Sequence, residues 1–213
     1  MNRRDAFRPG APLPRMRIGI VGTGSVGSAL ARGLSAANHD VVLGSRDPSS
    51  ASPDLRDRAD VVAVLDQRAA AAHGDVVVLA VPAGVVTDVA SDLADTLAGK
   101  TVVDTTNEYP AAGEDRALAL RVADVLPEAA VVKAFNTIGA ERMTDPVVDG
   151  ERATMFVAGA ETDVVERLAA DLGFDVVVAG DLSTAGHLEH LARFWIHLSV
   201  ARGRDIAFRF LES

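Results

Sequence analysis

A glycine-rich run near the amino terminus carries the strongest chemical signal in this sequence. It follows a short apolar stretch and reads Gly-Thr-Gly-Ser-Val-Gly. Backbone amides at such a turn, where a helix begins, face an anion and are helped by the helix dipole. A glycine-rich turn that binds nothing is the alternative, but the strand before the run and the helix after it favour a dinucleotide pyrophosphate site. The predicted contacts are Gly22, Thr23, Gly24, Ser25, Val26 and Gly27.

The end of the second predicted strand indicates which dinucleotide binds. An NAD site usually has an acidic residue there, about 20 residues beyond the loop, to hold the ribose hydroxyls. This chain has Ser45 and Arg46 instead. A guanidinium can make paired hydrogen bonds to a 2′-phosphate, and a hydroxyl can add another, so the pair favours NADP. Two alternatives stay open: Arg46 is a solvated loop residue, or Asp47 turns inward to a ribose.

Polar residues at the ends of three further strands are candidates for the nicotinamide half of the ligand. Ligands of open parallel sheets bind at the carboxyl ends of the strands. Asn107, Asn136 and Thr137 could orient a carboxamide, although Asn107 could equally be a turn residue. Lys133 lies close to a buried strand, so it should be either paired or functional. The predicted contacts are Ala80, Val81, Pro82, Thr105, Asn107, Lys133, Ala134, Phe135, Asn136 and Thr137.

Alternating apolar runs and helical periods predict the elements that position these residues. The run at 75–81 is continuously apolar, which indicates a strand buried on both faces of a parallel sheet. The succession predicts an α/β fold, a Rossmann-type doubly wound parallel sheet. Strands are expected at 17–21, 39–43, 60–65, 75–81, 101–105 and 130–135, with a loop at 47–52. Helices are expected at 26–37, 67–72, 83–97 and 116–126.

The chain is predicted to have three parts. Residues 1–15 hold four arginines and three prolines without an apolar core, which indicates a flexible leader and not a secretory signal. Met16 stands directly before the first strand and is an alternative start. Residues 16–150 form the NADP-binding Rossmann domain. Residues 151–213 form a small C-terminal α/β lobe that closes the cleft, with strands at 154–158 and 174–178, a helix at 162–172 and helix from 182 onward.

Charge and composition exclude several classes of function. The 213 residues carry a formal net charge of −9, which disfavours nucleic-acid and membrane partners. No cysteine is present, so disulfides and thiolate catalysis are excluded, and a cytoplasmic location is expected. The histidines do not form a metal-ligand pattern with carboxylates: His187 and His190 lie three apart in the last helical segment, but Glu189 between them should face elsewhere. No nucleophile–base pair can be identified, and no catalytic residue is assigned.

The glycine loop, the Gly-Ser-Arg at 44–46, the residues at 79–82 and the Val-Lys-Ala-Phe-Asn-Thr-Ile-Gly at 132–139 together resemble NADP oxidoreductases that use the deazaflavin coenzyme F420. The reductase domains of the six-transmembrane metalloreductases have a similar pattern. The resemblance runs from about residue 17 to 211. It implies bound NADP, a deazaflavin or other flavin-like co-substrate beside the nicotinamide, and a homodimer. Asn136, Thr137, Ile138 and Gly139 would line the deazaflavin pocket. The archaeal enzymes have His at the position of Asn136 and Pro at that of Gly139.

An apolar stripe in the last helix bears on the predicted homodimer. Its members could form an interface between two copies or face the core of one chain. They are Leu188, Leu191, Trp195 and Leu198.

Three functions are compatible with these features. The first is an oxidoreductase that transfers hydride between NADP(H) and a small-molecule acceptor, namely coenzyme F420 or a flavin-like molecule. Hydride transfer between two cofactors depends on orientation more than on acid–base groups. The second is an NADPH-dependent imine or carbonyl reductase. The third is a non-catalytic NADP-binding redox sensor.

Overall fold

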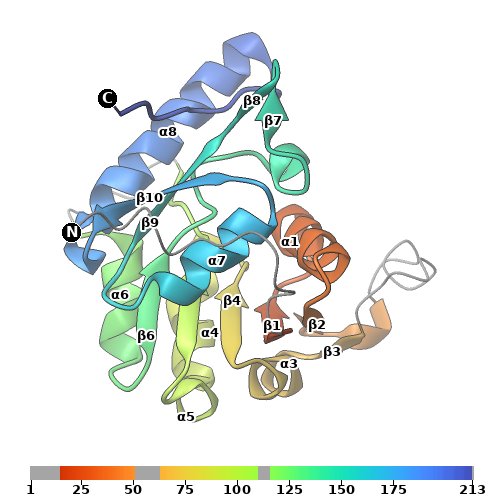
Figure 1. The fold of residues 1–213 in the computed structure, drawn as a ribbon. Helices are drawn as coiled ribbons and strands as arrows, with labels where there is room; N and C mark the ends of the chain where they lie inside the picture. The colour runs from red at the N-terminus through yellow and green to blue at the C-terminus, as the bar shows by residue number, and fades with distance from the viewer. Residues whose placement is uncertain (1–14, 51–62, 110–115, 213) are drawn as a thin grey trace, which may run out of the picture.

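A computed structural model describes residues 15–50, 63–109 and 116–212. Its centre is an eight-stranded sheet in the order β10-β9-β6-β5-β4-β1-β2-β3 (Figure 1). The strands are β1 (Arg17–Val21), β2 (Asp40–Ser45), β3 (Val64–Asp66), β4 (Val76–Leu79), β5 (Thr101–Asp104), β6 (Ala130–Lys133), β9 (Thr154–Ala158) and β10 (Asp175–Gly180). The first six are mutually parallel in the order 3-2-1-4-5-6, which is the Rossmann arrangement. The predicted fold class is therefore confirmed.

Helices cover both faces of this sheet (Figure 1). They are α1 (Ser25–Ala36), α3 (Gln67–His73), α4 (Val86–Asp92), α5 (Ala94–Leu97), α6 (Leu118–Val125), α7 (Asp163–Asp171) and α8 (Ala185–Arg202). Residues of α1 and α7 share one buried apolar cluster, and residues of α3 to α6 share a second. The sheet thus has a separate core on each face, as the continuous apolar strands predict.

The segment after residue 150 extends the same sheet. Strand β9 pairs with β6 in the antiparallel sense, and β10 pairs with β9 in the parallel sense. Two short strands precede β9 in the chain, β7 (Val147–Val148) and β8 (Glu151–Arg152). They form a hairpin with positive φ angles at Asp149 and Gly150, so the predicted boundary near 150 falls at a tight turn. The division into domains itself stays a prediction.

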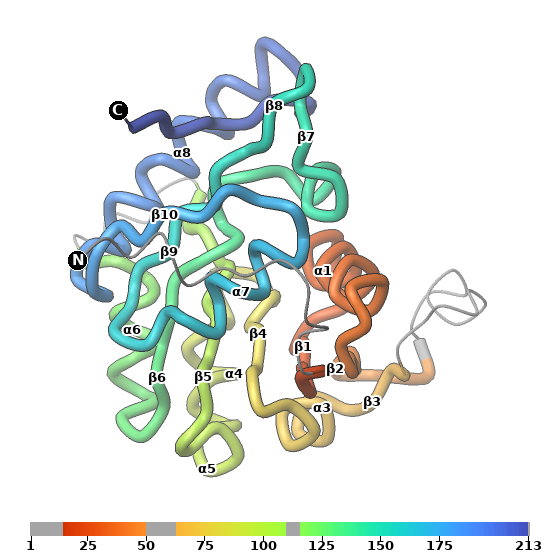
Figure 2. Tube along the Cα trace, viewed as in Figure 1, coloured from red at the N-terminus to blue at the C-terminus, as the bar shows by residue number. Residues whose placement is uncertain are grey.

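Helix α8 is the longest helix, and the chain turns back after it. Gly203, with φ of 82°, ends the helix, and the remaining residues return to the sheet (Figure 2). The amide of Thr154 at the start of β9 donates to the carbonyl of Phe208 at 2.9 Å. We call residues 204–212 the C-terminal tail.

Several predicted bounds differ from the structure. Strand β2 continues to Ser45, and the helix predicted at 83–97 is a 3₁₀ turn followed by α4 and α5, which are separated at Leu93. Strand β3 begins only at Val64; residues 60–62 of the predicted third strand, 51–52 of the predicted loop and nearly all of the predicted leader lie outside the described residues. The loop prediction also missed a 3₁₀ turn at Pro48–Ser50.

Candidate functional site

The glycine-rich loop joins β1 to α1 at the carboxyl edge of the sheet. Gly22 has φ of 124°, and a Cβ there would lie 2.2 Å from the carbonyl oxygen of Ala80. A Cβ on Gly27 would lie 2.1 Å from the carbonyl oxygen of Gly22. These two positions require glycine because the backbones of neighbouring segments approach closely.

Gly24 is different, because a Cβ there would meet no protein atom within 4 Å. It is the N-cap of α1, and no side chain caps that end of the helix. The first amides of α1 are thus left for an external acceptor. Open space over Gly24, backed by a twelve-residue helix, fits the approach of a pyrophosphate.

A cleft of about 630 Å³ lies beside this loop, between the ends of β1, β2 and β4. This is the point at which the strand order reverses, where ligands of doubly wound sheets bind. Eight predicted contacts line it: Gly22, Thr23, Gly24, Ser45, Arg46, Ala80, Val81 and Pro82. Gly44, Asp47, Gln67, Val85 and Val89 also line it and were not predicted as contacts. Val85 and Val89 belong to the turn and helix after Pro82, so their apolar period alone indicated only a core.

In the turn after β2, the carboxylate of Asp47 is hydrogen-bonded to a residue of the same turn. Asp47 Oδ1 accepts from the amide of Ser49 at 2.9 Å and from its hydroxyl at 2.5 Å. The hydroxyl of Ser45 donates to the carbonyl of Asp47 at 3.0 Å and accepts its amide at 3.2 Å. Arg46 is exposed on the cleft. A cation therefore faces the cleft, while the neighbouring carboxylate is bound within its own turn.

Three predicted contacts in the first turn of α1, Ser25, Val26 and Gly27, do not line this cleft. The others lie at or beyond the ends of β5 and β6 and do not line it either. Asn107 and Asn136 bind each other: Nδ2 of Asn107 donates to the Asn136 carbonyl at 2.7 Å, and Nδ2 of Asn136 donates to Asn107 Oδ1 at 3.0 Å. Thr105 Oγ1 donates to the carbonyl of Leu79 and ties the ends of β5 and β4 together. Two buried polar atoms in this region, Asn136 Oδ1 and Thr137 Oγ1, have no hydrogen-bond partner.

The backbone bends sharply just before these atoms. Phe135 has φ of 57°, a left-handed conformation that costs a non-glycine residue about 1–3 kcal/mol. Its amide donates to Met155 Sδ at 3.1 Å, and its ring packs edge-on against Phe174. The bend ends β6 earlier than predicted. Ala134, Phe135 and Ile138 are buried in the core, so their side chains face the interior.

Lys133 requires a correction, because its side chain is buried and paired instead of facing the cleft. Its ammonium lies 2.8 Å from Asp104 Oδ2 and 3.2 Å from Glu189 Oε1, and it also donates to the carbonyl of Thr106. Glu189 was expected only to face away from His187 and His190, and it is 3% exposed. Sequence reasoning named neither Asp104, the other carboxylate paired with this lysine, nor the burial of Glu189. The available signal was its spacing from Ala185 and Ala192, which puts it beside the buried face of α8.

Metal chemistry finds no support among the residues described: they contain no group of three or more histidine, cysteine, aspartate or glutamate side chains able to hold an ion. His39 is buried, and its Nε2 lies 3.1 Å from Asp171 Oδ2. In the parts of the chain with described coordinates, no helix is long and apolar enough to cross a membrane.

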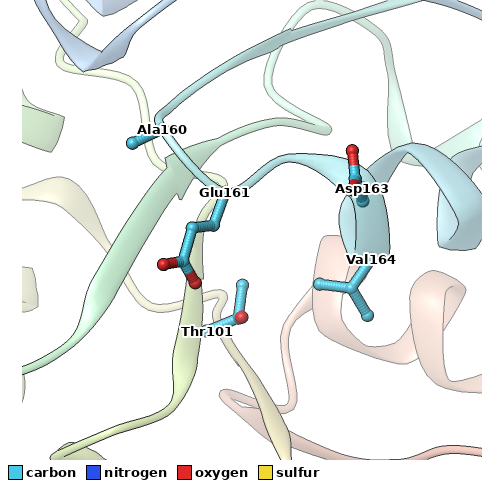
Figure 3. A pocket seen from close by; sticks show the side chains of 5 residues that line it. All are labelled: Thr101, Ala160, Glu161, Asp163 and Val164. Carbon is cyan, nitrogen blue, oxygen red and sulfur yellow. The ribbon is translucent and has the colours of Figure 1, made fainter.

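A second cavity, of about 380 Å³, lies at the amino end of strand β5, opposite the carboxyl ends that border the first cleft (Figure 3). Thr101 at the amino end of β5 lines it, with Glu161 and Asp163 beside the start of α7. Two carboxylates repel phosphate, so this cavity does not fit a dinucleotide.

Fold and cleft together define a Rossmann-type protein with an open cleft at the point where the strand order reverses. The family model described as "NADP oxidoreductase coenzyme F420-dependent" matches residues 17–108. A solved structure from Arthrobacter sp. FB24, described as a candidate F420-dependent NADP reductase, is 30% identical, with a TM-score of 0.83 over 92% of this chain and 100% of that chain. This chain belongs to that F420-dependent NADP oxidoreductase family.

Two further proteins are similar to this chain over most of its length. Rat metalloreductase STEAP3 is 31% identical over 183 residues, which are 84% of this chain and 36% of STEAP3. The chain thus spans about a third of that curated relative. A reductive aminase from Aspergillus terreus is 20% identical, with a TM-score of 0.65 over 89% of this chain and 64% of the aminase. At that identity the similarity shows only a shared fold.

Proposed function

We propose that this chain transfers hydride between NADP(H) and a deazaflavin, coenzyme F420, or a flavin-like acceptor. The observation that carries the nucleotide half is the turn after β2, where Arg46 is exposed on the cleft and the Asp47 carboxylate is hydrogen-bonded to Ser49. A guanidinium suits a 2′-phosphate, whereas a ribose diol needs a carboxylate acceptor. The open space over Gly24 and the uncapped start of α1 would take the pyrophosphate.

The ends of β5 and β6 would hold the nicotinamide half. Asn136 Oδ1 and Thr137 Oγ1 are buried without partners, and a buried polar atom without a partner is costly unless a ligand satisfies it. An acceptor oxygen and a hydroxyl are suited to the amide of a carboxamide. Ser25, Val26 and Gly27 would support the phosphates through the first turn of α1. Ile138 and Gly139 would border the acceptor, since Gly139 lies against the Trp195 ring.

The chemistry proposed needs orientation rather than a protein acid. When bound, the reduced nicotinamide supplies the hydride, and a deazaflavin ring accepts it together with a proton from solvent. Among the described residues that line the cleft, Asp47 is the single acidic group, and no histidine, lysine or tyrosine is present. An imine or carbonyl reductase usually places a proton donor next to the reacting carbon. This cleft would hold the 2′-phosphate half of NADP and not the nicotinamide, so the preference for a cofactor-like acceptor over an imine or ketone rests on the family match.

The deciding experiment is a hydride-transfer assay with purified protein, NADPH and oxidised coenzyme F420, following loss of the visible absorbance of the deazaflavin. NADH and flavin mononucleotide are used in parallel reactions. We expect bleaching with NADPH and much slower bleaching with NADH. Binding of NADPH without oxidation by either acceptor would contradict the proposal and favour a redox sensor, and turnover of an imine or ketone would favour a reductase of that class.

A glycine variant serves as the matched control for contaminating activity. Gly24→Ala adds one methyl group where no protein atom lies within 4 Å, so the fold should be unaffected. The methyl would occupy space needed by the pyrophosphate. Bleaching should therefore disappear while the unfolding temperature stays the same, and full activity in this variant would mean that the pyrophosphate does not bind over Gly24.

A further inference from the structure

We infer that Lys133 is a positioning residue, which uses Asp104 and Glu189 to fix the wall that faces the nicotinamide. The inference deepens the proposed function and rests on it, because it assumes that the nicotinamide half lies along Asn107 and Asn136. It gives Lys133 a role without direct contact to either cofactor.

The lysine ammonium makes two hydrogen bonds and one ion pair inside the protein. Its partners are the carboxylates of Asp104 and Glu189 and the carbonyl of Thr106. Lys133 and Asp104 are completely buried, and Glu189 is 3% exposed. Buried charges have a high desolvation cost, which only close pairing offsets. The charged groups of Lys133, Asp104 and Glu189 therefore have little freedom to move apart.

Asp104, Lys133 and Glu189 belong to segments far apart in the sequence. Asp104 ends β5, and its other oxygen, Oδ1, accepts from the amide and hydroxyl of Thr106 at 2.9 and 2.7 Å. Asp104 therefore shapes the short turn that leads to Asn107. Lys133 ends β6, three residues before Asn136. One ammonium thus fixes the bases of both strand-end segments that carry the amide pair.

Glu189 brings helix α8 to the same point. Its carboxylate oxygens accept the amides of Leu118 and Ala119 at 3.1 and 3.2 Å, at the start of α6. The carbonyl of Leu188, one residue earlier, accepts from Nδ2 of Asn136 at 3.2 Å. That second bond leaves Asn136 Oδ1 as the unpartnered atom of the amide. The orientation of Asn136 is therefore coupled to the position of α8, which Lys133 holds through Glu189.

Two ligands separate this role from simple stabilisation. NADPH spans the whole proposed site, whereas 2′,5′-ADP occupies only the half made by the glycine loop and Arg46. We would titrate Lys133→Met and Glu189→Gln with both ligands, and record the fluorescence of bound dihydronicotinamide as a readout of the ring environment. Asp171→Asn is the matched control, because it alters an ion pair with buried His39 that lies away from the cleft.

We expect both variants to bind 2′,5′-ADP like the wild type, and to bind NADPH about tenfold more weakly with a changed fluorescence, since small displacements of positioning groups have large effects. Glu189→Gln should be milder, because it keeps an oxygen for the α6 amides. Asp171→Asn should change the affinity for neither ligand. Unchanged NADPH binding and fluorescence in both variants would overturn the inference, as would equal weakening of both ligands or loss of folding in both variants.

Failure of the proposed function gives a different result. If the wild-type protein bound neither NADPH nor 2′,5′-ADP, that result would contradict the proposed nucleotide site and also the inference that rests on it. If the wild-type protein bound both ligands and the variants behaved identically to it, that result would contradict only the positioning role of Lys133.

Discussion

Arg46 and Asp47 are neighbours directly after β2 and both line the cleft, yet the structure gives their side chains different surroundings. Sequence reasoning identified the pair but left open whether Asp47 turns toward a ribose. The outcome depends on Ser49, whose amide and hydroxyl both bind the Asp47 carboxylate. Aspartate commonly binds the backbone two residues ahead in this way, but the sequence does not show which competing partner it takes. Arg46 is exposed and lines the cleft.

The charge of Arg46 can be tested directly. Arg46→Glu should weaken NADPH binding by about 2–3 kcal/mol, because a charge-assisted hydrogen bond is lost and repulsion of the 2′-phosphate replaces it. NADH binding should change little, since NADH has no 2′-phosphate. Titration calorimetry with both nucleotides measures the difference. Arg202→Glu, which changes an exposed arginine in the last turn of α8, is the control. Equal effects on NADPH and NADH would mean that Arg46 does not bind the 2′-phosphate.

At the level of elements, the sequence predicted which strands and helices exist better than where they end. Periodicity finds the buried centre of an element, but its end depends on local geometry. Strand β6 stops at Lys133 because Phe135 adopts a left-handed conformation, which a phenylalanine does not signal. The hairpin of β7 and β8 was missed because two-residue strands have no measurable period. Burial of Glu189 followed from tertiary packing of α8 against α6, which overrides the usual exposure of glutamate.

The C-terminal tail is held near the proposed acceptor site by a contact that depends on pH. Arg204 lies over the Trp195 ring, 5.2 Å from its centre, and binds Glu141 Oε1 at 2.6 Å. This hydrogen bond lowers the pKa of Glu141 below its usual value, while desolvation opposes it. A carboxyl whose pKa is lowered by folding stabilises the docked tail above its usual pKa. That stabilisation is lost as the pH falls through the lowered value.

The indole of Trp195, the single tryptophan of the chain, reports on this docking. Its emission should change at a pH below about 4.3, the ordinary pKa of glutamate, because Glu141 takes up a proton and releases Arg204 only as the pH falls through its lowered pKa. Glu141→Gln should show the altered emission already at neutral pH and lack the acid step. Glu161→Gln, in the cavity at the amino end of β5, should behave like the wild type. An acid step that persists unchanged in Glu141→Gln would rule out this contact as its cause.

At the scale of the whole molecule, alternation of strands and helices was enough to predict a doubly wound parallel sheet. It was not enough to predict that β9 would pair with β6 in the antiparallel sense, because strand direction depends on the path of the connection between them. The stripe on α8 was ambiguous for a similar reason. Leu188 and Trp195 are buried within this chain, which supports the interpretation that this side of α8 faces the core of one chain. The homodimer stays a prediction.

Shared sheet pairing predicts that residues on both sides of position 150 unfold together. Strands β6 and β9 are hydrogen-bonded neighbours, and the buried pair of Lys133 and Glu189 spans the same junction. Thermal unfolding followed by Trp195 fluorescence, which reports on the C-terminal segment, should therefore coincide with unfolding followed by far-ultraviolet circular dichroism. NADPH at about 100 times its Kd adds about 2.7 kcal/mol, which should raise both midpoints by about 5–10 °C. If the Trp195 transition came earlier and did not respond to NADPH, the C-terminal segment would be an independent lobe, and closure of the cleft would have to be a separate equilibrium.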